Sequence, residues 1–169
     1  MNKQFPHPFS DMAAKYRAMR RKLPAVVSQL AVTTFKENFR AQGLVVNTGQ
    51  IEKWKPRQTQ DRRNTSRRAI LIKTGRLRRS LRAAPTYDYA RVVSSAPYAG
   101  IHNRGGPMRG QMRAFATNLR SRSTRLRQSG APARMPARPF MVTTPLLLQR
   151  ASAFIQKELE QLFTNATSK

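Results

Sequence analysis

Apolar side chains recur every three or four residues in two long stretches of the chain, one towards each end. Between residues 25 and 42 they make one face of a predicted helix, formed by Val26, Val27, Leu30, Ala31, Thr34, Phe35 and Phe39. Between residues 145 and 163 they make a broader face, formed by Leu147, Leu148, Ala151, Phe154, Ile155, Leu159 and Leu162. Thr144 is expected to cap this last helix, with Pro145 at its first position. Both stretches are typical of helices that pack onto a core.

Proline and glycine mark the expected ends of the first helices. A short basic helix is predicted within residues 1–24, and Pro24 is expected to end it and to begin the next helix. Gly43 fits the position just after the end of that second helix. The pattern therefore predicts an N-terminal extension of residues 1–24, a folded domain of residues 25–163 and a C-terminal tail of residues 164–169.

The middle of the chain contains short apolar runs that are typical of strands. Residues 69–73, 87–94 and 139–143 are each predicted to form a strand. Residues 44–69 are polar and are expected to be mostly irregular, with Trp54 anchoring them to the core. Helices that flank short strands predict an α+β fold, in which a small antiparallel or mixed sheet packs against two main helices.

Charge is the most unusual global property of the sequence. The chain has 33 Lys and Arg against 7 Asp and Glu, which gives a formal net charge of +26. DNA, RNA, anionic membranes and acidic protein surfaces are the partners that such a charge favours, and a solvated basic surface without a target is the alternative. No apolar run is long enough to cross a membrane, and the basic N-terminus lacks the features of a signal peptide. We therefore expect assembly in the cytoplasm, without a membrane partner.

Arginine is concentrated between residues 104 and 138, a stretch without any acidic residue. The arginines expected to contact a partner protein or DNA are Arg109, Arg113, Arg120, Arg122, Arg125, Arg127, Arg134 and Arg138. This segment has too few apolar residues to order itself, so it is predicted to be a flexible arm inserted in the domain. Phe115 is the only aromatic residue of residues 107–138, which argues against a platform that stacks on bases.

Catalytic and metal-binding patterns are absent from the sequence. The chain has no cysteine, its acidic residues are scattered, and no phosphate-binding loop or HExxH motif is present. His102 is a candidate general base, but a histidine that supports a turn is the favoured interpretation. We predict no catalytic, metal or cofactor site, and a nuclease that uses Asp61, Asp88 and His102 is the enzyme alternative.

Three segments in order, residues 73–81, 96–106 and 136–141, resemble the phage virion morphogenesis family, of the phage Mu G-protein and phage P2 S-protein type. The resemblance spans residues 25–163 and extends to the tail-completion proteins of long-tailed phages. The residues that carry it are Thr74, Gly75, Leu77, Tyr98, His102, Asn103, Gly105, Arg138, Pro139 and Phe140. The resemblance implies that these residues have structural roles. The long arginine-rich connection before residue 136 departs from the pattern.

The resemblance implies a structural protein of a tailed phage, located in the virion at the neck or tail. Such a protein would form a homo-oligomeric ring, contact portal, adaptor or tail proteins, and help join tail to head. Its arm would clamp acidic protein surfaces or meet genomic DNA in the channel, and we favour protein contact because a channel must release DNA. The alternative is a sequence-independent nucleic-acid-binding protein involved in DNA packaging or condensation, which the net charge supports.

Overall fold

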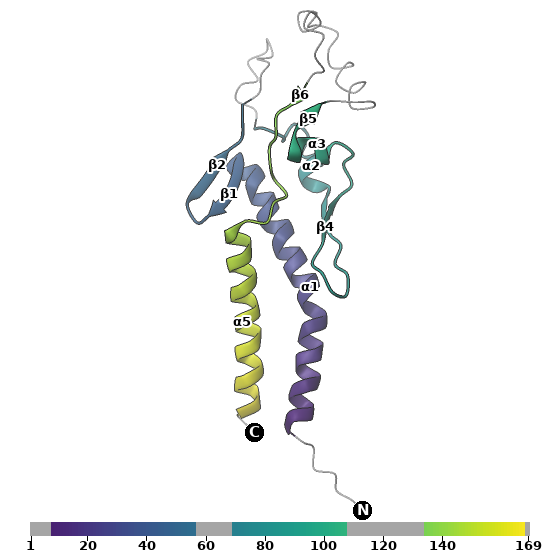
Figure 1. Cartoon of the computed structure of the whole chain (residues 1–169), viewed down its shortest axis with the longest axis vertical. Coiled ribbons are helices and arrows are strands. Elements are labelled where there is room, and N and C mark those ends of the chain that lie inside the picture. The colour runs from purple at the N-terminus through teal and green to yellow at the C-terminus, as the bar shows by residue number, and fades with distance from the viewer. Residues whose placement is uncertain (1–7, 57–68, 108–133, 168–169) are drawn as a thin grey trace, which may run out of the picture.

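Two long helices lie side by side, and the small elements of the chain gather around one end of the pair (Figure 1). The computed structural model describes residues 8–56, 69–107 and 134–167, with side chains between residues 11 and 164 of those ranges. The long helices are α1 (Pro8–Ala41) and α5 (Pro145–Thr167). The start of α1 and the end of α5 lie together at the far end of the pair. The fold class is α+β, as predicted.

Helix α1 is continuous, so the expectation that Pro24 separates two helices is wrong. Proline lacks an N–H, and its ring opposes a helix interior at a cost of about 3 kcal/mol. Here Pro24 is buried, and its carbonyl accepts a hydrogen bond from the Ser28 hydroxyl at 2.6 Å. Helical segments on both sides continue through the proline because tertiary packing outweighs this local preference.

A β-hairpin follows α1, where the sequence predicted irregular chain. Strand β1 (Gly43–Asn47) pairs antiparallel with β2 (Gln50–Lys53). Gln42, with a φ of 54°, takes the left-handed conformation that ends α1, a role predicted for Gly43. Gly43 instead allows close strand pairing, since a Cβ there would lie 2.4 Å from the Glu52 carbonyl oxygen.

The second antiparallel pair is formed by β3 (Leu81–Ala83) and β4 (Val92–Ser94), and it packs beside α1. Helix α2 (Arg76–Arg79) precedes it and helix α3 (Ala99–Arg104) follows it. Residues 69–73 form turns instead of the predicted strand, because Leu71 has a left-handed φ of 61° that interrupts extended chain. The predicted strand of residues 87–94 is shortened to β4, because the preceding residues form the loop from β3.

The third pair is short: β5 (Gly106–Pro107) lies antiparallel to β6 (Arg134–Met135). Pro107 therefore lies opposite Arg134, and residues 108–133 lie outside the described residues. The predicted strand at residues 139–143 is irregular chain without a strand partner. In the part of the chain that the structure describes, three separate two-stranded sheets therefore replace the single small sheet that the sequence suggested.

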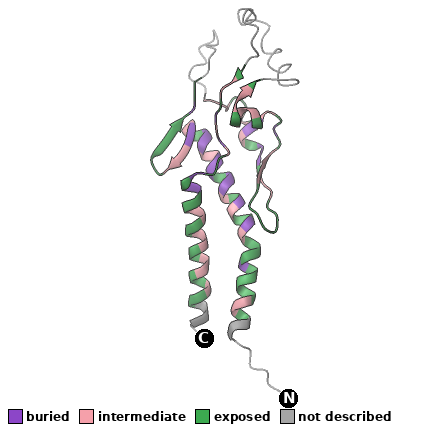
Figure 2. Ribbon diagram, viewed as in Figure 1, coloured by how far each residue is buried: buried purple, intermediate pink, exposed green. Residues whose placement is uncertain are grey.

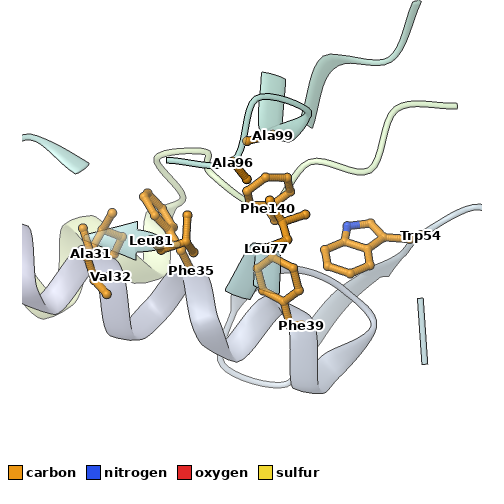
Figure 3. Packing of buried hydrophobic residues seen from close by; sticks show 11 residues of the cluster. Ala31, Val32, Phe35, Phe39, Trp54, Leu77, Leu81, Ala96, Ala99 and Phe140 are labelled. Carbon is orange, nitrogen blue, oxygen red and sulfur yellow. The ribbon is translucent and has the colours of Figure 1, made fainter. Parts of the chain in front are cut away.

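The core lies where the hairpins meet the upper part of α1 (Figure 2). Phe39 of α1 is fully buried between Trp54 and Phe140, with ring centroids 5.6 Å and 5.1 Å away (Figure 3). Leu77 and Leu81, which lie four residues apart, are also buried in this cluster. Thr144 and Pro145 begin α5 as predicted, and the helix continues to Thr167 where a tail was expected from residue 164.

Candidate assembly site

The segment around Phe140 is held by side-chain amides where a strand would be held by a neighbouring strand. The Asn103 side-chain oxygen accepts hydrogen bonds from the backbone N–H of Phe140 at 2.8 Å and of Met141 at 2.9 Å. The Asn38 amide donates to the Phe140 carbonyl at 3.0 Å, while its own oxygen accepts from the Val45 N–H at 2.9 Å. Two asparagine side chains therefore provide the hydrogen bonds that the backbone around Phe140 would otherwise make to a neighbouring strand.

Trp54 and Arg138 secure the chain on both sides of Phe140. The Trp54 indole N–H donates to the Pro139 carbonyl at 2.8 Å, which confirms the predicted anchor. Arg138 donates from Nε to the Lys55 carbonyl at 3.1 Å and from Nη2 to that of Pro56 at 3.3 Å. Three segments that lie far apart in the sequence are thereby joined around one aromatic core.

Arg138 is buried, with 6% of its surface exposed, so its guanidinium does not project from an arm as predicted. Its backbone N–H donates to the His102 carbonyl at 2.8 Å, which ties it to α3. The guanidinium N–H groups therefore donate to backbone carbonyls of the same subunit and not to a partner. Its expected structural role in the family motif agrees with this position, and its expected contact with a partner does not.

His102 supports the turn through its backbone and its ring face. The ring packs edge-on against Tyr98, with centroids 5.7 Å apart, and Nδ1 has no hydrogen-bond partner among the described residues. Burial lowers the pKa of His102, and the nearby charge of Arg138 lowers it further. Both effects favour the neutral form of the ring, and Asn103 supplies the side-chain hydrogen bonds of this turn.

The remaining motif residues shape the backbone. Gly105 ends α3 with a φ of 72°, and a Cβ there would lie 2.7 Å from the Ala137 amide nitrogen. Gly75, not Thr74, is the N-terminal cap residue of α2. The Thr74 hydroxyl accepts instead from the Arg76 N–H at 3.4 Å.

The predicted arm is described only at its base. Arg134 lies exposed on β6, as a contact residue should. The other arginines predicted to make contacts, apart from Arg138, lie outside the described residues: Arg109, Arg113, Arg120, Arg122, Arg125 and Arg127. Asp61, from the enzyme alternative, also lies outside them, and Asp88 is exposed in the β3–β4 loop. These contact predictions therefore remain predictions.

Asn38 is the important residue that sequence reasoning missed. It falls between Phe35 and Phe39 on α1 and is almost fully buried, with 1% of its surface exposed. A lone amide beside the apolar stripe of a helix was the available signal, because a buried amide needs hydrogen-bond partners.

The chemistry of the described residues is that of packing and backbone support. Within the ranges that the structure covers, no three acidic or histidine side chains are grouped so that they could hold a metal ion. None of the helices in those ranges is long and apolar enough to cross a membrane.

The fold and this site define a small basic protein, in which the motif residues connect backbone segments and build the core. The chain belongs to the phage virion morphogenesis family, whose sequence model matches residues 2–160. The resemblance found in the three motifs is thereby confirmed, and the protein has a role in building a bacteriophage virion. No curated protein and no solved structure matches the chain.

Proposed function

We infer that the protein is a non-catalytic component of the phage neck, which forms a ring and completes the junction between tail and head. The family supports a role in the virion. The observation that carries the more specific proposal is the incomplete core between the far halves of α1 and α5.

These far halves bury very little. Between residues 11 and 27 of α1, only Met19 and Pro24 are buried, and no α5 side chain from Leu148 to Thr164 is buried. Phe163, in the far half of α5, is 59% exposed although its side chain is large and apolar. Isolated helices gain most of their stability from packing, so a helix pair this thin needs neighbours along its length. Copies of the same subunit, related by rotation, provide such neighbours in a ring.

The net charge of +26 limits how such a ring is built. Like-charged subunits repel one another unless acidic partners or DNA offset the charge. A position between other virion proteins, around a channel that carries DNA, provides both kinds of counter-charge. We therefore propose portal, adaptor or tail proteins as the partners, with non-specific contact to DNA in the lumen.

Electron microscopy of particles from a phage that lacks this gene tests the proposal. A joining role predicts full heads and separate, complete tails in the lysate. Empty or misshapen heads would contradict it and would point to a function in head assembly or packaging.

The same charge favours a second function, sequence-independent binding of nucleic acid during packaging. Filter binding of the purified chain to duplex DNA, repeated over a range of salt, separates the two. Tight binding with a steep loss of affinity as salt rises would favour the second function, because each released counterion contributes to that slope.

A further inference from the structure

A concave, positively charged surface lies between α1 and the segment that leads into α2. It is a shallow depression of about 520 Å³ that is widely open to solvent. Four cations line it: Lys36, Lys73, Arg78 and Arg79. We call this surface the cationic hollow. It is separate from the hydrogen bonds around Phe140, and the proposed ring does not account for its four cations.

The Thr74-Gly75 motif shapes one wall of the hollow. Gly75 takes a φ of 69°, which lets the chain turn sharply into α2. A Cβ at this glycine would lie 3.0 Å from Nη1 of Arg79, so the missing side chain leaves room for that guanidinium. Leu77 is buried and holds α2 on the core, which leaves the neighbouring Arg78 and Arg79 beside the hollow.

The positive charge of the hollow is not balanced by the part of the chain that the structure describes. The only ion pair there joins Arg150 to Glu37 at 2.8 Å. Glu37 follows Lys36 directly, but its carboxylate accepts a hydrogen bond from Arg150 of α5. Among the residues that the structure describes, no acidic side chain lines the hollow. Four like charges in one concavity concentrate a positive potential that attracts an anionic group.

The shape of the hollow favours a carboxylate-bearing peptide over a DNA duplex. A duplex presents a continuous backbone, which basic stripes on open surfaces follow, whereas a small concavity admits projecting side chains. Ile72 adds an apolar patch to the wall, suited to the methylene groups of Glu or Asp side chains. Arginine guanidinium groups bind carboxylates through paired, charge-assisted hydrogen bonds.

A second copy of this chain is a poor source of those carboxylates. The chain has only 7 Asp and Glu against 33 Lys and Arg, so two copies repel each other overall. We propose that the cationic hollow binds an acidic peptide segment of a different virion protein. This inference rests on the proposed function, because it gives the ring a specific attachment to a neighbouring component.

Fluorescence anisotropy with labelled hexaglutamate tests the proposal on the full-length protein. The variant K73Q/R78Q/R79Q removes three of the four cations, and R20Q/R21Q/K22Q removes the same charge from an exposed stretch of α1. We expect the first variant to weaken peptide binding by about tenfold or more, because its three cations line one hollow and can contact the same peptide together. We expect the control to weaken binding by less than about twofold, because single exposed ion pairs contribute little. Equal losses in the two variants, or no loss in the first, would overturn the proposal.

Two further measurements keep the result interpretable. The double variant K73Q/R79Q changes only exposed side chains and should lose affinity in the same direction, with a thermal midpoint equal to that of the wild type. A 20-base-pair duplex measured in parallel identifies the preferred anion. If the triple variant in the hollow weakens duplex binding as much as peptide binding, the hollow is a phosphate site and the proposal fails.

Failure of this inference and failure of the proposed function give different results. If a phage without the gene still joins heads to tails, the neck role is wrong whatever the peptide does. If joining is lost in that phage but the triple variant binds hexaglutamate as well as the wild type, only the inference about the hollow is wrong.

Discussion

Asn103 makes the most informative single perturbation, because one side chain there satisfies two backbone N–H groups. Its oxygen accepts from Phe140 at 2.8 Å and from Met141 at 2.9 Å, and its amide donates to the Met141 carbonyl at 3.4 Å. In Asn103→Ala, both N–H groups lose their partner. An unsatisfied buried group costs about 1–3 kcal/mol, and Asn103 is half-buried, so some water can enter. We therefore expect a loss of about 2–4 kcal/mol in the free energy of unfolding.

Urea denaturation followed by circular dichroism measures this loss, and the thermal midpoint should fall by roughly 5–15 °C for a chain of this size. Asn103→Asp is the matched control, because its carboxylate still accepts both N–H groups and loses only the long bond to Met141. We expect it to lose less than half as much as the alanine variant. If Asn103→Ala loses less than about 1 kcal/mol, or if the two variants are equally unstable, the reasoning about this hydrogen-bonded segment is refuted.

Four other substitutions, one of them a control, test the packing, the turn and the half-buried histidine. Phe140→Ala should cost about 3–5 kcal/mol in urea denaturation, because it empties the fully buried centre of the core, while Leu148→Ala at an exposed position should cost less than about 1 kcal/mol; similar losses would contradict this core. Gly75→Ala should lower stability by about 1–2 kcal/mol, because its φ of 69° strains any Cβ, and an unchanged thermal midpoint would argue against that conformation. Burial lowers the pKa of His102 in the folded state, so the unfolded chain binds more protons below the ordinary pKa of 6.5, and stability should fall as pH drops below that value. His102→Gln should flatten this dependence between pH 7.5 and 5, and an equal slope in both proteins would show that other groups cause it.

The long helices and the core anchors could be read from the sequence because they depend on local periodicity. Phe35 and Phe39 lie four apart and both are buried, and Thr144 with Pro145 marks the start of α5. Trp54 was expected on the core from the size of its side chain alone, and it packs there against Phe39.

What failed in the fold depends on contacts between distant residues. Pro24 remains inside α1 because tertiary packing outweighs its local preference, and that packing is not written into the neighbouring residues. The segment at Phe140 reads as a strand from its composition, yet its partners are side-chain amides from α1 and α3. Periodicity indicates that a segment is buried but does not show which groups form hydrogen bonds with its backbone.

The motif residues were located in the sequence, but their roles depended on the structure. Arg138 lies at the end of a basic stretch, and nothing local distinguishes it from the arginines before it. Burial against the carbonyls of Lys55 and Pro56 separates it from them, and these carbonyls lie more than eighty residues earlier in the chain. Charge counts could not show which cations point into the protein.

The most direct test of the central claim is an in vitro joining titration. Full heads and free tails from a phage lacking the gene are mixed with increasing amounts of the purified protein, and infectious particles are counted. A structural ring component predicts a yield that rises in proportion to added protein and levels off at a fixed number of subunits per joined particle. Full joining with far less than one subunit per particle would show catalytic action, and no joining at any amount would show that the protein does not complete the neck; either result contradicts the account.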